Sequence, residues 1–390
     1  RNDSPHARGG DREGLGAGQG RTGDEQLSGD ENGEAQQRVL RDMNMGTPKQ
    51  YSVVQMQRFA GFGVGLASLL TENVLSHPCI VFRRQCQVHH CSYSYHLQPF
   101  SVLNVMLKIQ RAQGFSTVWK GMTSRFVVQG IQLGSEGIIA EFTDFPREVT
   151  THSTFKQVFK HIALKGLSIV VTSPFFCASL IETVQSDIAS ETPWVLDCVK
   201  VGFRRLLGWG APTTTRLLPV WKLVLPTVLY GLPHYLVTSI VQYVALVLLR
   251  QGKDRHKFDI DEPLADRYML ETYFPELFAT FLGNLFSDVL LFPLETVMHR
   301  LHIQGTRTII DNTGWGSGVL AINTRYEGMS ECFRIVVREE GFFGLYKGFG
   351  ALILQYLLHA AILKITKCIY DIMSENFPSR PKAPPRQRQQ

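Results

Sequence analysis

Apolar stretches alternate with polar segments through most of the chain beyond residue 55. The first runs from Phe59 to His77 and ends at Pro78. The stretch Leu223–Leu249 contains no Asp, Glu, Lys or Arg and is long enough to cross a bilayer as a helix. We predict further membrane helices in the other apolar stretches, at Phe126–Phe142, Val158–Val184, Tyr273–Met298 and Gly348–Ile372.

Three shorter segments between these stretches have apolar residues at helical spacing. In Phe100–Arg111 these residues are Val102, Leu103, Val105, Met106 and Ile109. Such spacing predicts an amphipathic helix on the surface. Trp194–Leu207 and Tyr326–Arg338 are the other two segments, and we expect a long polar loop before the last one.

The order of membrane helix, surface helix and membrane helix therefore occurs three times. Pro78, Leu180 and Pro293 occupy corresponding places, about a hundred residues apart, which indicates internal repeats. We predict an all-α membrane protein with six transmembrane helices in three repeats, at 56–145, 146–255 (degenerate) and 256–373. The polar segment 1–55 and the basic, Pro-rich segment 374–390 are predicted to be disordered tails.

Composition narrows the function classes. The net charge of +6 is mild and no ladder of basic and aromatic residues is present, so the sequence does not favour nucleic-acid binding. A mean hydropathy of −0.03 understates the apolar stretches, because the polar tail enters the average. Seven scattered cysteines favour free thiols over a disulfide framework.

Candidate catalytic and metal motifs are weak. The segment Cys86–Cys91, with His96 after it, could be read as a metal site, but its spacing matches no zinc motif, and a polar loop is the better interpretation. The sequence contains no phosphate loop, nucleophile elbow or HExxH motif. We therefore predict no enzyme activity, catalytic residue, cofactor or metal. The tail also contains many acids, which a matrix-targeting peptide lacks.

One motif at the end of the chain carries more information. Pro293 and Glu295 end an apolar stretch and Arg300 follows; later come Glu340-Gly341, a spacer of four residues and Tyr346-Lys347-Gly348. A proline inside a membrane helix frees a backbone carbonyl and kinks the helix. The later glycines turn the chain from a surface helix into the next membrane helix, and we expect the aromatic residue and the base to anchor at the membrane interface.

The first repeat contains the same motif. Pro78 and Arg83 are followed by Gln113-Gly114, in which glutamine replaces the acid, and then by Trp119-Lys120-Gly121. This repeated pattern resembles the signature of the mitochondrial carrier family. The resemblance implies the carrier fold, with two membrane helices and a short surface helix in each repeat.

The resemblance also implies a gate, in which an acid of one repeat pairs with a base of a neighbouring repeat. The acid positions hold Ile80, Glu182 and Glu295, and the base positions hold Arg83, Gln185 and Met298. In the family's cyclic order, only Glu295 and Arg83 can pair. Glu182 is left facing a water-filled cavity or interface, which we favour, or paired outside the gate, or functional.

Longer stretches, among them residues 178–186 and 299–313, resemble a degenerate outer-membrane branch of the same family. This resemblance implies a non-transporting, multi-pass adaptor of the mitochondrial outer membrane, acting in fission and fusion, cristae maintenance and lipid supply. It implies membrane lipids, the fusion and fission GTPases, the cristae-organising complex and an endoplasmic-reticulum membrane complex as partners, and no nucleic acid. The alternative is a working mitochondrial solute carrier with a reduced salt-bridge gate.

Overall fold

Long apolar sequences form helices in a membrane, because a helix satisfies its own backbone hydrogen bonds there. The computed structural model describes residues 73–149, 153–185, 197–207, 218–256, 268–306, 308–311 and 318–376, all within one compact unit, Gly61–Gln390. The longest helices are α5 (Phe155–Val184), α7 (Val220–His256), α8 (Tyr268–Ile303) and α10 (Phe349–Asn376). A helix over 73–88 and α4 (Met122–Thr143) are shorter.

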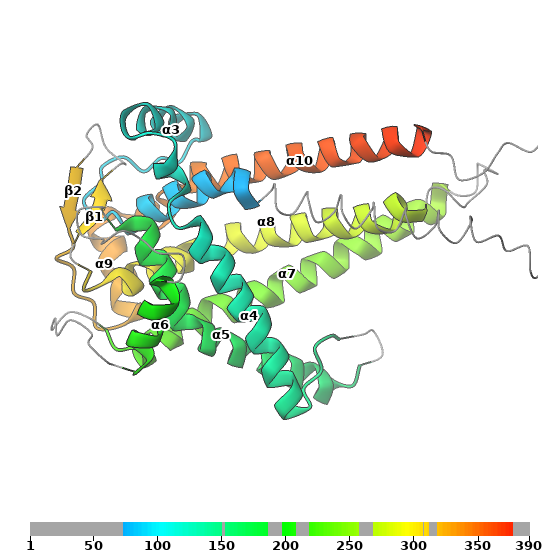
Figure 1. Cartoon of the computed structure of the whole chain (residues 1–390), viewed down its shortest axis with the longest axis horizontal. Helices are drawn as coiled ribbons and strands as arrows, with labels where there is room; N and C mark the ends of the chain where they lie inside the picture. The colour runs from blue at the N-terminus through cyan, green and yellow to red at the C-terminus, as the bar shows by residue number, and fades with distance from the viewer. Residues whose placement is uncertain are drawn as a thin grey trace, which may run out of the picture. The chain divides into compact units, whose positions relative to one another are not determined.

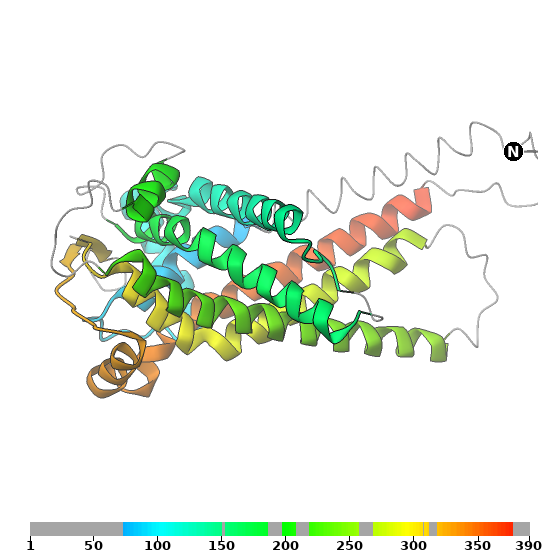
Figure 2. The same ribbon diagram turned by 90° about the horizontal axis from the view of Figure 1, so that it is seen from below.

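The long helices pack alongside one another. Helix α8 lies between α7 and α10, and α5 packs against α4, α7 and α8 (Figures 1 and 2). Prolines occur inside these helices without ending them, at Pro174 in α5, Pro226 and Pro233 in α7, and Pro275 and Pro293 in α8.

Four segments of the described chain are long and apolar enough to cross a membrane: Phe155–Val184, Val220–Gln251, Phe274–Ile303 and Phe342–Ile369. The stretch predicted as the second membrane helix does form α4, but it is not one of these four. Most of the first predicted stretch, 59–77, lies outside the described residues, as does the predicted tail 1–55. Of the predicted tail 374–390, residues 374–376 belong to α10 and the rest lies outside the described residues. Six membrane helices in three repeats remain a prediction.

The three predicted surface helices are present. They are α3 (Pro99–Gln113), α6 (Asp197–Leu207) and α9 (Met329–Glu340), and each buries a narrow stripe, such as Val102 and Ile109 of α3. Short 3-10 helices follow α3 and α9, namely η1 (Ser116–Trp119) and η4 (Phe342–Tyr346). Gly114 and Gly341 end α3 and α9 with φ of 89° and 76°, which glycine adopts at little cost.

The long polar loop predicted between Met298 and Tyr326 is wrong in two respects. Helix α8 continues to Ile303, and a hairpin of β1 (Thr308–Asp311) and β2 (Gly318–Ala321) follows. The strands pair antiparallel with Thr308 opposite Ala321. Thr308, Ile309 and Ile310 are β-branched residues, which favour strands.

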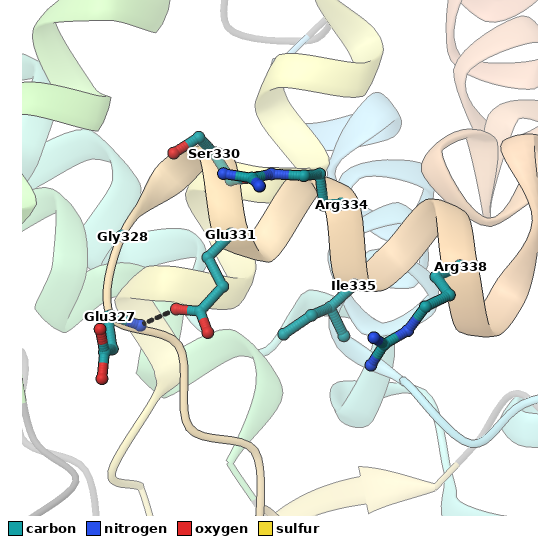
Figure 3. A pocket seen from close by; sticks show the side chains of 7 residues that line it. All are labelled: Glu327, Gly328, Ser330, Glu331, Arg334, Ile335 and Arg338. Carbon is teal, nitrogen blue, oxygen red and sulfur yellow. Dashed lines mark hydrogen bonds between the residues drawn. The ribbon is translucent and has the colours of Figure 1, made fainter.

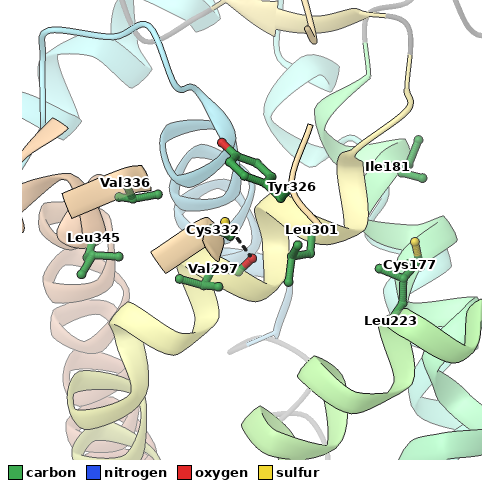
Figure 4. Packing of buried hydrophobic residues seen from close by; sticks show 9 residues of the cluster. All are labelled: Cys177, Ile181, Leu223, Val297, Leu301, Tyr326, Cys332, Val336 and Leu345. Atoms are coloured by element: carbon green, nitrogen blue, oxygen red, sulfur yellow. Dashed lines mark hydrogen bonds between the residues drawn. The ribbon is translucent and has the colours of Figure 1, made fainter. Parts of the chain in front are cut away.

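Buried apolar clusters hold the elements together at the end where α8, α9 and η4 meet. One cluster joins Val297 and Leu301 of α8 to Val336 of α9 and Leu345 of η4 (Figure 4). Another places Ile309 of β1 against Val88, Leu180 and Val184. The second cluster is the reason why the hairpin is part of the bundle rather than a free loop.

All seven cysteines are free thiols, as predicted. Cys86 lies inside the helix over 73–88 and is 1% exposed, so the polar-loop interpretation does not hold for it, whereas Cys91 is exposed. Within the described residues, no three His, Cys, Asp or Glu side chains are arranged to hold a metal ion.

Candidate functional site

The predicted pair of gate residues is in contact. Nη2 of Arg83, on the helix over 73–88, lies 3.2 Å from Oε1 of Glu295 on α8, and both side chains are 8% exposed. Pro78 lies within the first of these helices, and Pro293 within α8, two residues before the acid. The pair therefore ties repeat one to repeat three inside the bundle.

A second carboxylate lies close to the same base. Oδ2 of Asp288 is 3.6 Å from Nη1 of Arg83, and it accepts a hydrogen bond of 2.8 Å from the hydroxyl of Tyr356 on α10. Oδ1 of Asp288 is 2.8 Å from Nε2 of His234 on α7. Asp288 thereby links α7, α8 and α10, and the sequence reasoning missed it. The available signal is that Asp288 is the one charged residue between Glu276 and Glu295 in an apolar stretch of α8.

Gln87 continues the network from Glu295 toward the end of the bundle. Its Nε2 donates to Glu295 over 2.8 Å, so its Oε1 is left to accept from Nδ1 of His299 over 2.7 Å. Nε of Arg300 donates to the carbonyl oxygen of Gln87 over 2.9 Å. Both ends of the Gln87 amide are used, which fixes its orientation.

Arg300, Glu340 and Lys347 come together although they are far apart in the sequence. The Arg300 guanidinium holds both carboxylate oxygens of Glu340, and Nζ of Lys347 is 2.6 Å from Oε2. Burial alone would raise the pKa of the Glu340 carboxyl, but the hydrogen bond and charge of Arg300, with the charge of Lys347, lower it.

Lys347, which is predicted to anchor at the membrane interface, is enclosed by groups of the protein. Its side chain is 1% exposed, and its Nζ donates to the carbonyl oxygens of His89 and His90 over 3.1 and 3.4 Å. A buried ammonium group needs such partners, because an unpaired buried charge is costly. Lys347 therefore binds repeat three to the loop after the first helix of repeat one.

The hairpin closes over the same region. Nε2 of His89 is 3.0 Å from Oδ1 of Asp311 in β1, and Ile309 of β1 forms a bridge with Gln185 at the end of α5. Ile309 is 1% exposed. One element of repeat three thus contacts both other repeats.

The second repeat contributes differently. Glu182 is partly buried, beside Ser124, and the base whose charge acts on it is Lys120, which lies outside the gate positions. Nζ of Lys120 donates to the carbonyl oxygen of Gln185 over 2.8 Å. Met298, at the third base position, is completely buried and packs without a charge. Among the gate positions, the pair of Arg83 and Glu295 is the one formed.

The glycine turns position these side chains. Gly121 and Gly348 have φ of 72° and 83°, and a Cβ on Gly348 would lie 2.8 Å from Cβ of Cys86. Trp119 stacks on Phe115 at 5.0 Å and donates from Nε1 to the carbonyl oxygen of Val74 over 2.9 Å. Tyr346 stacks on Phe292 at 5.9 Å. The close approach at Gly348 brings Lys347 to the loop after the first helix.

A groove lies apart from this network, on α9 (Figure 3). It has a volume of about 860 Å³ and is lined by side chains of both charges, with Ile335 at its centre. The backbone N–H of Glu327 donates to Glu331 over 2.6 Å at one end, and Arg338 lies at the other. This groove offers charged side chains of both signs beside an apolar surface.

A bundle of long apolar helices, a proline-anchored acid and base, and the glycine turns define a carrier-like membrane protein. The sequence model of the family described as "Mitochondrial carrier protein" matches residues 271–379. The chain is 56% identical to "Mitochondrial outer membrane protein SLC25A46" of Danio rerio over 325 residues, which cover 83% of this chain and 80% of that protein. It is 54% identical to the protein of the same name from Homo sapiens over 332 residues, covering 85% and 79%.

The chain belongs to the mitochondrial carrier family. Within that family it is similar to the SLC25A46 proteins of fish, birds and mammals. It is a multi-pass protein of the mitochondrial outer membrane. The resemblance and the location predicted from the sequence are thereby confirmed.

Proposed function

We propose that this protein is a non-transporting, non-enzymatic adaptor that regulates mitochondrial shape from the outer membrane. Its functions are the balance of fission and fusion, the maintenance of cristae and the supply of lipids. The fusion and fission GTPases, the cristae-organising complex and an endoplasmic-reticulum membrane complex are its proposed partners. Six membrane helices in three repeats form its scaffold.

The observation that carries this proposal is the construction of the closed end. A gate with three equivalent ion pairs opens when those pairs separate, but here one pair, Arg83 and Glu295, occupies the gate positions. The buried hydrogen bond from Lys347 to His89 and the backbone bridge at Ile309 are further contacts between the predicted repeats. Opening this end would leave buried charges without partners, which costs several kcal/mol for each pair.

The groove on α9 supports an adaptor role as well. Arg334 and Arg338 stand one helical turn apart beside Glu331, outside the apolar segments that suit a membrane. Where an interface has a charged rim, electrostatic complementarity steers the encounter of the two proteins and orients them. A protein partner with the opposite charge pattern fits this surface.

The retained pair of Arg83 and Glu295 favours one alternative, a solute carrier with a reduced gate. Solute exchange by the full-length protein in liposomes separates the two. The internal solutes should include carboxylates, nucleotides and amino acids, and a transporting member of the family serves as the positive control. We expect exchange at the level of empty liposomes, while the same protein restores mitochondrial shape in cells that lack it. Exchange above that level would support the carrier.

A further inference from the structure

Helix α3 has a second apolar side, which lies outside the core. Its buried side contains Val102 and Ile109, which are 0% and 8% exposed. Phe100, Leu103 and Leu107 are instead 80%, 43% and 41% exposed. Positions three and four apart lie on one face of a helix, so these three side chains form a stripe of their own. An exposed apolar surface of this kind indicates contact with a membrane or with another protein.

Contacts with α10 fix the position of α3 on the bundle. The backbone N–H of Gly350 in α10 donates to the carbonyl oxygen of His96 over 3.0 Å, and a Cβ on Gly350 would lie 2.5 Å from the carbonyl oxygen of Gln98, which precedes α3. The buried side of α3 belongs to one apolar cluster with Ala351 and Leu354. Helix α3 therefore lies beside the beginning of α10, at the edge of the bundle (Figure 1).

This position favours lipid over a protein partner as the cover of the exposed stripe. Gly350, Ala351 and Leu354 all belong to Phe342–Ile369, a segment that is long and apolar enough to cross a membrane. Leu357, about one turn further along α10, is 57% exposed, which suits a side chain in contact with lipid. Helix α3 also contains no Asp or Glu that would have to leave water. An amphipathic helix at this level lies in the plane of the interface, with its apolar face against the acyl chains.

We propose that α3 is an in-plane membrane helix whose exposed stripe, Phe100, Leu103 and Leu107, lies among the acyl chains of one leaflet. Arg111 continues this stripe, because it follows Leu107 by four positions. A long basic side chain keeps its apolar stem beside the acyl chains and places its guanidinium among the headgroup phosphates. Phospholipids of that leaflet are thus the ligand of this surface. The inference does not depend on the adaptor function.

Fluorescence quenching in nanodiscs of phosphatidylcholine tests what surrounds the stripe. The full-length chain carries Cys91→Ser and Cys368→Ser, which remove the exposed thiols, whereas the other five cysteines are buried. Leu103→Cys then places the environment-sensitive label NBD on the stripe. Nitroxide groups on the acyl chains quench a label among lipids, and iodide quenches a label in water.

Ala112→Cys is the matched control. Ala112 is exposed on the same helix, and at about 100° per residue its nine positions from Leu103 bring it to the opposite side. We expect the label on Leu103→Cys to emit further to the blue, to be quenched by the nitroxide lipid and to lose its quenching by iodide. The label on Ala112→Cys should be quenched by iodide. Leu107→Cys is a second position on the stripe and should behave as Leu103→Cys does.

Two results would overturn the proposal. Equal quenching by iodide at Leu103→Cys and Ala112→Cys would place the stripe in water, where it is open to a protein partner. A label on the stripe that is shielded from both quenchers would mean that protein, such as a second copy of this chain, covers it. Leu107→Cys decides between these results if Leu103→Cys does not fold.

Discussion

Asp288 shows how one buried side chain can hold several helices together. Its two oxygens contact Tyr356, His234 and Arg83, which lie on three different helices. Each of these groups would otherwise be a polar atom inside an apolar bundle, where an unsatisfied group is costly. The polar residues of this end therefore stabilise one another as a set, and removing one leaves the others without partners.

Removing either member of the gate pair should destabilise the protein. Glu295→Ala leaves Arg83 with the more distant carboxylate of Asp288, 3.6 Å away, and Arg83→Ala leaves Glu295 without its base. Breaking a buried pair typically costs about 3–5 kcal/mol. Thermal unfolding in detergent and steady-state abundance in cells measure the effect.

The matched control is Glu141→Ala, which removes a pair with Arg147 that is 3.9 Å long and largely exposed. Such surface pairs contribute about 0–1 kcal/mol. Equal unfolding temperatures of the Glu295 and Glu141 variants would contradict the structural role of the gate pair.

Replacing Gly348 by valine should prevent the turn from forming. Its φ is 83°, where a side chain costs roughly 1–2 kcal/mol, and a Cβ would also meet Cβ of Cys86 at 2.8 Å. Gly121 has φ of 72° and its Cβ would lie 2.6 Å from Cγ2 of Thr183, so the same change there should act alike. We expect low abundance for both variants.

Gly130→Ala is the control for these turns, because a Cβ there meets nothing within 4 Å. It lies inside α4, where alanine should stabilise the helix by roughly 0.5–1 kcal/mol relative to glycine. Normal abundance of both turn variants would show that close approach at these glycines is not required.

The sequence predicts some residues of this polar network and not others, and each difference has a physical reason. The pairing of Arg83 with Glu295 is what the resemblance to the carrier family implies, because the two residues occupy the base and acid positions of neighbouring repeats. The local sequence does not show that Glu340 and two carbonyl oxygens enclose Lys347, because those oxygens belong to His89 and His90, which are distant in the chain. Gln87 was missed since its partners are distant in the chain.

At the scale of elements, the hairpin is the part that periodicity could not predict. Its strands have four residues each, too short for a reliable alternation, and the polar residues around them favour a loop. The helices, by contrast, extend over many turns, so their apolar periodicity was clear. What makes the hairpin stable is tertiary: Ile309 packs against Val88 and Leu180.

The contact between the hairpin and the first helix should respond to pH. Burial lowers the pKa of His89 below its ordinary value of 6.5, Asp311 opposes this, and the charge of Lys347 adds to it. The folded state therefore prefers the neutral imidazole. The contribution of the neutral His89 imidazole to stability is complete above the pKa that the group has in the unfolded state. It is lost as pH falls from about 6.5 toward the lower pKa of the folded state.

Thermal unfolding at about pH 7.5 and about pH 5.5 tests this expectation. His89→Gln removes the titrating group, so the variant should lose less Tm than the parent chain between these two values. An equal loss of Tm in the parent chain and the His89 variant would show that this imidazole does not titrate differently on folding.

Considered as a whole, the three predicted repeats contribute unequally to the described structure. Repeats one and three share the gate pair, the turn glycines and the contacts of Lys347. Predicted repeat two has no gate pair of its own, and it is attached through other contacts, such as His234 with Asp288 and Gln185 with Lys120 and Ile309. The sequence already indicated this inequality, because Leu180 replaces the proline and the second aromatic-base-glycine turn is not recognisable.

This inequality predicts that restored gate bases will not restore transport. Gln185→Arg and Met298→Arg place bases at the two empty positions, and the second could then pair with Glu182. Met298 is completely buried, however, and Gln185 lies under the hairpin. The new charges would therefore lie at a closed end that the other contacts between the repeats still hold together. Separating the repeats would still break the contacts of Lys347 and Glu340.

We expect the folded double variant in liposomes to exchange solutes no faster than the parent chain, beside a transporting family member as the positive control. Exchange by the double variant with an inert parent chain would mean that the missing bases alone prevent transport.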